Sequence, residues 1–214
     1  MLVNKQVVSA VTTAAKTRRT QEERRSTAER RIIRAAIKII SRKGLAGLTL
    51  AAAGEEAGYS RGIAGHHFGK KDDLLVALVR HITDQFRQML ADTATSGPGL
   101  PKLIALVNAY LAAVEQHSDN VRALHLILTE GVNSPALAPA LAAASEVSIR
   151  GIEKPIRDGI AAGEIRADVD PYAQAVLILA GLRGVLAQKL VDPGIDLQRI
   201  RKEFVDSLAR SLKV

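Results

Sequence analysis

Apolar residues recur at helical spacing along most of this chain. Between 27 and 43, the positions Ile33, Ala36, Ile37 and Ile40 fall on one face of a helix. No segment shows the strict alternation of a half-buried strand, and no hairpin signal or internal repeat is present. The pattern predicts an all-α protein of about nine helices, at 27–43, 51–57, a short segment after 60, 71–91, 100–116, 120–131, 135–162, 171–191 and 197–213.

The segment 49–75 carries the most specific pattern. Residues 51–57 are small and acidic and suit a helix, and Gly58 ends it because glycine tolerates the left-handed conformation of a helix C-terminus. Ser60 is a predicted N-cap for a following short helix. Small side chains at Ala53, Gly54 and Ala57 would allow two helices to cross closely. Two short helices joined in this way form a helix-turn-helix, whose second helix enters the DNA major groove.

The stretch that begins at Ile33 and ends at Leu75 resembles the tetracycline-repressor (TetR) family of bacterial transcription regulators over about 45 residues without a gap. The residues that match in register are Ile33, Ala36, Gly44, Thr49, Ala57, Gly58, Ser60, Gly62, His67, Phe68, Lys71, Leu74 and Leu75. The chain departs from the family at Ala53, Gly54 and Gly65, where relatives usually have Ile, Ala and Tyr. Gly54 is expected to cost about 1 kcal/mol relative to Ala in mid-helix, and the phosphate or base contact of the family's Tyr cannot be carried over to Gly65.

The resemblance assigns DNA contacts to the helix-turn-helix. Thr49 would cap the first helix, whose N-terminus attracts phosphate. Arg61 is the candidate for direct readout of guanine, with a phosphate contact as the alternative. Ile63 would meet a thymine methyl or else belong to the core. The expected groove-facing residues are Ser60, Arg61, Gly62, Ile63, Gly65 and His66, and the expected phosphate-facing residues are His67, Lys70 and Lys71. The pair His66-His67 is not read as a metal site, because adjacent helical residues point to different sides.

Positive charge is concentrated in the same third of the chain. Residues 1–75 hold 15 basic and 7 acidic residues, a net charge of +8, whereas the rest hold 15 of each. A basic head suits phosphate neutralisation. Residues 1–25 lack an apolar stripe and are predicted to form a flexible arm, either tracking DNA or a disordered extension without that role. Its candidate DNA contacts are Arg18, Arg19, Arg24 and Arg25.

The remaining helices are expected to form a body at 71–214, after a helix-turn-helix domain at 26–70. The resemblance implies that this body dimerises through its last two helices and binds a small molecule among its middle helices. The candidate interface residues are Ala173, Ala180, Gly181, Gly184, Ala187, Ile200, Phe204 and Leu208, with burial inside one subunit as the alternative. The candidate pocket residues are Phe86, Met89, Tyr110, His125, Glu130 and Asn133, each of which also suits a core or surface position. A mostly aliphatic wall would favour an apolar ligand.

Composition limits the other functions. Of 214 residues, 47% are hydrophobic and 3% aromatic, and none is Cys, which excludes disulfides and thiol catalysis. No nucleophile–base pair, phosphate-binding loop or metal cluster is recognisable, so an enzyme is disfavoured and no cofactor is expected. No apolar run approaches the roughly 20 residues of a membrane span. A cytoplasmic, nucleoid-associated protein is predicted. The favoured function is a dimeric, ligand-responsive repressor of a palindromic operator. The alternative is a sequence-tolerant, nucleoid-type DNA-binding protein without a ligand switch.

Overall fold

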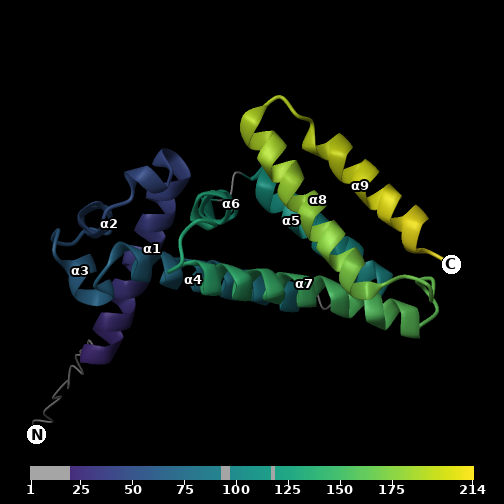
Figure 1. Ribbon diagram of the computed structural model, residues 1–214, viewed down its shortest axis with the longest axis horizontal. Helices are drawn as coiled ribbons and strands as arrows, with labels where there is room; N and C mark the ends of the chain where they lie inside the picture. Colours follow the sequence, from purple (N-terminus) through teal and green to yellow (C-terminus); the bar gives the residue numbers. More distant parts are fainter. Residues whose placement is uncertain (1–19, 93–96, 117–118) are drawn as a thin grey trace, which may run out of the picture.

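A computed structural model describes residues 20–92, 97–116 and 119–214 (Figure 1). Within these ranges the chain forms nine α-helices, one 3-10 helix and no strand, which confirms the all-α prediction. The elements are α1 (Gln21–Lys43), η1 (Leu45–Gly47), α2 (Leu50–Glu56), α3 (Ile63–Phe68), α4 (Lys71–Asp92), α5 (Leu100–Glu115), α6 (Asp119–Gly131), α7 (Ala138–Ala161), α8 (Pro171–Val191) and α9 (Leu197–Leu212).

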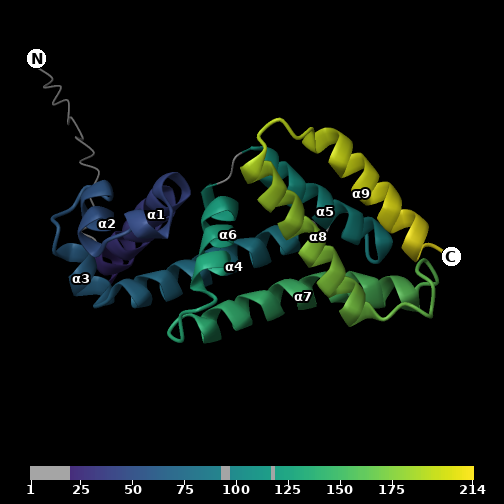
Figure 2. The ribbon, with the colours of Figure 1, turned by 45° about the horizontal axis from the view of Figure 1, so that its top comes forward.

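The molecule is elongated, with a small head at one end and a larger body at the other. Helices α1, α2 and α3 form the head, and α5, α8 and α9 lie together at the far end (Figure 1). Helices α4 and α7 pack against each other and run lengthwise from the head into the body (Figure 2). Helix α6 lies between the head and α8 and contacts both α1 and α8.

Helix α1 begins earlier than the sequence pattern predicted. Thr20 and Glu23 form a reciprocal capping box, in which the Thr20 side chain accepts from the Glu23 N–H and the Glu23 carboxylate accepts from the Thr20 N–H. The helix therefore starts at Gln21 rather than near Thr27. Arg24 and Arg25, which were assigned to a flexible arm, lie in its first turns. The other predicted arm contacts, Arg18 and Arg19, lie outside the described residues.

The hydrophobic core crosses the predicted boundary between head and body at residue 70. One cluster of buried residues joins Ile32, Ile33 and Ile40 of α1 to Ala123 and Ile127 of α6, and it continues through α4 and α7. Ala123 and Ile127 are completely buried. A second cluster fills the body between α5, α7, α8 and α9. The head thus shares its core with the body rather than having one of its own.

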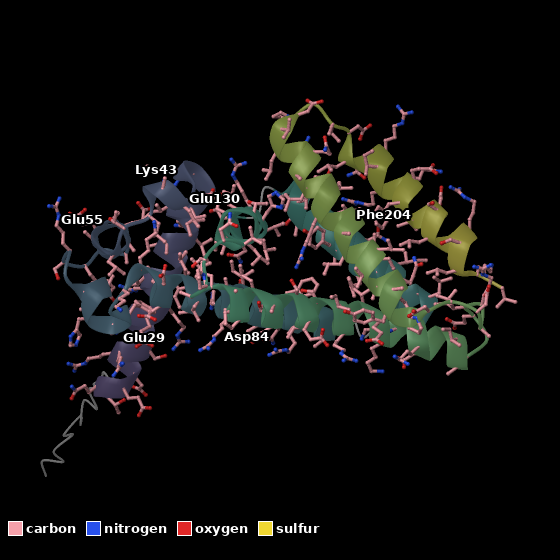
Figure 3. All side chains as sticks on the ribbon, viewed as in Figure 1. Glu29, Lys43, Glu55, Asp84, Glu130 and Phe204 are labelled. Carbon is pink, nitrogen blue, oxygen red and sulfur yellow. The ribbon has the colours of Figure 1, made fainter. Side chains whose placement is uncertain are left out.

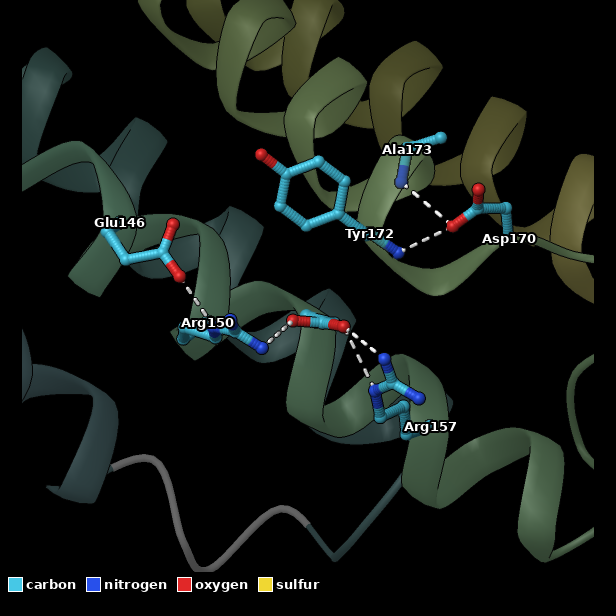
Figure 4. Close-up of polar contacts among 7 residues, drawn as sticks. Glu146, Arg150, Arg157, Asp170, Tyr172 and Ala173 are labelled. Atoms are coloured by element: carbon cyan, nitrogen blue, oxygen red, sulfur yellow. Dashed lines mark hydrogen bonds and ion pairs between the residues drawn. The ribbon is translucent and has the colours of Figure 1, made fainter. Parts of the chain in front are cut away.

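Helix α7 runs without interruption through Pro155. Pro155 removes one backbone donor from the helix. Beside it, the buried Glu153 carboxylate accepts hydrogen bonds from Arg150 and Arg157, one turn to either side (Figure 4). These side-chain contacts brace the helix across the proline. Asp170 caps the neighbouring α8, accepting from the backbone N–H groups of its first residues.

Candidate nucleic-acid interface and ligand cavity

Helix α2 is terminated at both ends as its sequence predicts. The Thr49 hydroxyl caps the N-terminus by accepting from the Ala52 N–H at 3.0 Å. At the other end, Gly58 adopts φ +79°, and the N–H groups of Gly58 and Tyr59 donate to the carbonyls of Glu55 and Gly54. This is a Schellman motif, which requires a left-handed residue at the glycine position. The motif turns the chain sharply toward α3.

Helix α3 starts later than predicted, and Ser60 does not cap it. The N-cap position is occupied by Gly62, which has no side chain to accept a hydrogen bond, and the helix runs from Ile63 to Phe68. The N–H of Ile63 donates instead to the backbone carbonyl of Ser60. Ser60 therefore leaves its hydroxyl exposed in the turn between α2 and α3. The prediction erred because the turn after Gly58 contains two more residues than a direct Ser cap allows.

The outer surface of the turn and of α3 is polar and basic. Ser60, Arg61, Gly62, His66 and Lys70 are exposed, while Ile63 and Gly65 are half-buried. Arg61 donates to the carboxylate of Glu55 on α2, and both side chains are largely in solvent. Figure 3 shows Glu55 at the outer edge of the head. An ion pair this exposed is readily exchanged for another anion, so the Arg61 guanidinium is available to a phosphate or a base.

Two residues expected to face phosphates are turned into the protein instead. The His67 ring is only 8% exposed, and its Nδ1 lies 3.3 Å from the Glu29 carboxylate of α1. Burial opposes ionisation of Glu29, but hydrogen bonds from Arg25 and His67 outweigh it and lower the Glu29 pKa. The ammonium of Lys71 donates to the Leu45 carbonyl at 2.8 Å. His67 thus fastens α3 to α1, and Lys71 fastens the start of α4 to the 3-10 helix η1 that follows α1.

Helix α1 adds further positive charge beside α3. A surface groove lies between the two helices, lined from α1 by Arg24, Arg25 and Arg31 and from the α3 side by Ile63 and His66. All three arginines are exposed. A duplex approaching α3 would therefore meet the first turns of α1 as well. Arg31 was not among the predicted contacts, because the periodicity of α1 alone does not show which polar side faces α3.

The body contains a cavity of about 150 Å³ lined by α4, α5, α6, α7 and α8. Its wall is mainly aliphatic and aromatic. The predicted pocket residues Phe86, Tyr110 and His125 line it, together with Ile82, Thr83, Gln85, Ala113, Asn120, Val121, Leu124, Leu128, Ser148, Leu179, Arg183 and Leu186. Burial lowers the pKa of His125, with Arg183 acting in the same direction, and burial raises the pKa of Tyr110 to about 12. Both groups are consequently neutral near pH 7.

The other predicted pocket residues do not line this cavity. Glu130 is exposed on α6, with its carboxylate near Gly44 at the end of α1 (Figure 3), and Asn133 is exposed in the turn after α6. Both lie beyond the turns of α6 that face the cavity. The side chain of Met89 lies outside the described part of the structure. Arg183 was missed, although a lone arginine within the apolar helix α8 was the available signal.

Helix α6 connects this cavity to the head. Val121, Leu124, His125 and Leu128 face the cavity, whereas Ala123 and Ile127 pack into the core shared with α1. In addition, Arg122 donates to the Ser41 carbonyl of α1 at 2.7 Å. A displacement of α6 by a molecule in the cavity would therefore act directly on α1.

Helix α8 presents an apolar face to solvent. Ala173, Ala180 and Gly184 are exposed and share this face with Val176 and Leu177, the latter 65% exposed. The predicted interface residues Gly181, Ala187, Ile200 and Phe204 are half-buried, and Phe204 lies over Gly181 between α8 and α9 (Figure 3). Leu208 is buried in the body core, because the apolar side of α9 packs on α5. This removes Leu208 from any exposed interface.

Helix α8 also meets the length and hydropathy of a membrane span, which the sequence analysis had not expected. An 18-residue window within Pro171–Val191 has a mean hydropathy of 1.4, and 28% of that window is buried. The helix nevertheless packs along α7 and carries the charged Arg183 at its centre.

Comparisons with known proteins agree with this architecture. Residues 32–78 match the family model described as "Bacterial regulatory proteins, tetR family". The chain is 32% identical over 108 residues to the HTH-type transcriptional regulator BetI of Paraburkholderia phytofirmans, a match covering 50% of this chain and 55% of BetI. The chain thus spans about half the length of the curated relatives it matches.

Two solved structures share nearly the whole fold. SmeT, the repressor of the Stenotrophomonas maltophilia multidrug efflux pump SmeDEF, superposes with a TM-score of 0.70 at 26% identity, covering 86% of this chain and 90% of SmeT. A transcriptional regulator from Saccharomonospora viridis, solved in complex with choline, has a TM-score of 0.78 at 24% identity, covering 88% of this chain and 99% of that one. At this identity, the second likeness concerns the fold alone.

Proposed function

Because the chain belongs to the TetR family of bacterial regulatory proteins, we propose that it is a ligand-responsive transcription regulator. It acts as a repressor that binds a palindromic operator as a homodimer and is released when a small molecule enters the body cavity. It is not an enzyme and works in the cytoplasm, on the nucleoid. The observation that best supports this proposal is the exposed basic surface around α3. This surface belongs to a helix-turn-helix that is held against α1.

Three kinds of DNA contact follow from the exposed surface. Arg61 reads a base edge in the major groove, where a guanidinium pairs bidentately with guanine. Ser60, His66 and Lys70 surround it and contact the backbone or neighbouring bases. Arg24, Arg25 and Arg31 on α1 neutralise phosphates beside the groove. The N-terminus of α2, capped by Thr49, lies toward the backbone. His67 and Lys71 contribute by fixing the position of α3.

The homodimer is proposed from the exposed apolar face of α8. Ala173, Ala180 and Gly184 have small side chains that allow a second helix to approach closely, and Leu177 supplies apolar area beside them. A twofold dimer also matches two recognition helices to successive major grooves of a palindrome.

Release of the protein from its operator depends on the two faces of α6, one toward the cavity and one toward α1. A molecule in the cavity that favours a displaced α6 changes the position of α1, and with it the spacing of the two heads in the dimer. This requires that the molecule bind one arrangement more tightly than the other. The cavity lined by α4, α5, α6, α7 and α8 offers the site for such a molecule.

The test is binding of the purified protein to the DNA upstream of its own gene, with a shuffled sequence as competitor, across a salt series. A single palindromic footprint that survives the competitor is expected. Arg61→Ala should weaken specific binding about tenfold or more, whereas Arg199→Ala, an exposed arginine on α9, should not. Equal affinity for both DNAs with a steep salt slope would instead favour a sequence-tolerant DNA-binding protein.

A further inference from the structure

Among the described residues that line the cavity, Arg183 is the only one with a charged side chain. It projects from the middle of α8 among apolar neighbours, and it is half-buried. The lining contains no Asp or Glu among the described residues. Two other polar residues of the lining, Tyr110 and His125, are neutral near pH 7 and can form hydrogen bonds.

The Arg183 guanidinium also lacks a counter-ion in the described part of the chain. Its Nη atoms lie 3.4 and 3.5 Å from the Ser145 hydroxyl, at the limit of hydrogen-bonding distance, and no carboxylate among the described residues lies within 4 Å. By comparison, Arg201, another partly buried arginine, donates to Glu115 at 2.6 Å. A partly buried charge without a partner is unfavourable unless an anion arrives to pair with it. Burial of Arg183 lowers its pKa, but an arginine remains charged.

We propose that the effector is a compact monocarboxylate, bound with its carboxylate on Arg183 and its apolar body among Phe86, Leu124, Leu128 and Leu186. This inference rests on the proposed function of the cavity as the effector site. A volume of about 150 Å³ suits a body the size of a single ring or a short branched chain. One arginine with two neutral donors matches one negative charge, whereas a phosphate dianion would call for more donors. A cationic effector is disfavoured by the same arginine.

The first experiment compares ligands on the unaltered protein by isothermal titration calorimetry. The probes are benzoate, 4-methylpentanoate, the uncharged benzamide, and the cation benzyltrimethylammonium. Benzoate or 4-methylpentanoate should bind at least tenfold more tightly than benzamide, and the cation should bind least. Equal affinity for benzoate and benzamide, tighter binding of the cation, or no binding of either carboxylate would overturn the proposal.

The second experiment changes the arginine. Arg183→Gln should weaken carboxylate binding about tenfold to hundredfold and abolish the preference over benzamide. Arg183→Lys should restore part of it, because the charge is kept. Arg210→Gln, which alters an exposed arginine of α9, is the matched control and should bind like the wild type. Retained discrimination in a folded Arg183→Gln variant would refute the role of Arg183.

Operator binding without ligand separates this inference from the proposed function. If the wild-type protein binds its operator specifically but neither carboxylate, the effector chemistry is wrong and the regulator stands. If carboxylates bind with the expected preference but no operator is found, the proposed function fails and the binding chemistry stands.

Discussion

Replacing Gly54 with Ala tests the packing of the helix-turn-helix most directly. By helix propensity alone, the substitution should stabilise α2 by about 1 kcal/mol. The structure predicts the opposite sign. A Cβ at position 54 would lie 2.7 Å from the backbone carbonyl oxygen of Ser60 and 3.3 Å from Cγ2 of Ile63. The carbonyl belongs to the turn that positions α3, so it cannot rotate away as a flexible side chain would.

The magnitude follows from the balance of the two effects. Overpacking of this kind costs about 1–3 kcal/mol, against a propensity gain of about 1 kcal/mol. Gly54→Ala is therefore expected to lower the free energy of unfolding by up to about 2 kcal/mol. For a chain of this length, each kcal/mol corresponds to a fall in Tm of roughly 2–4 °C.

Gly65→Ala is the matched control, because a Cβ there meets no atom within 4 Å and the residue is also helical. It should raise the free energy of unfolding by up to about 1 kcal/mol. Both variants are measured by urea denaturation, followed by circular dichroism at one protein concentration, since dimerisation makes stability concentration-dependent. If Gly54→Ala stabilises the protein as much as Gly65→Ala does, the close approach of α2 and α3 is not a constraint and the reasoning is refuted.

Three further predictions address the interior, the pH response and the dimer. Lys71→Met removes the donor to the Leu45 carbonyl and should lower the free energy of unfolding by about 1 kcal/mol in urea denaturation. Lys70→Met should leave stability unchanged and weaken operator binding. The reverse pattern would contradict the assignment of Lys71 to the interior and Lys70 to the DNA-facing surface. Burial and Arg34 lower the pKa of His81 from 6.5, so the unfolded chain takes up the proton first and stability should fall as pH drops below about 6.5. His81→Leu should flatten that fall between pH 7.5 and 5, and an unchanged slope would exclude His81 as its source. Leu177→Glu should convert the proposed dimer to monomers, as measured by analytical ultracentrifugation, while the equally exposed Val132→Glu should not. Dimers in both variants would rule out the α8 face.

The features predicted successfully from the sequence are local ones. Helical periodicity, the Thr49 cap and the Gly58 stop depend on residues within a few positions of one another, so their physics is contained in a short segment. The Ser60 cap failed even locally, because glycine at the N-cap position and a longer turn were equally compatible with the pattern.

The features that could not be predicted depend on distant partners. His67 contacts a carboxylate 38 positions away, and Lys71 contacts a carbonyl 26 positions away. From the sequence both look like solvated cations beside a recognition helix. Likewise, periodicity placed Arg183 within an apolar helix but did not show that five helices line a cavity around it. The expected effect of Gly54→Ala on the free energy of unfolding changes sign for the same reason. The obstructing atom belongs to another element.

The core shared by the head and α6 has a consequence for recombination between regulators of this kind. A chimera joined at residue 70 would place a foreign α6 against α1, replacing the fully buried Ala123 and Ile127 with side chains fitted to another head. Each mismatched methylene at such a contact costs on the order of 1 kcal/mol. The unit that can be exchanged between proteins is thus the head together with one side of α6. These two segments lie far apart in the sequence, and they must be transferred together if the head is to keep its packing.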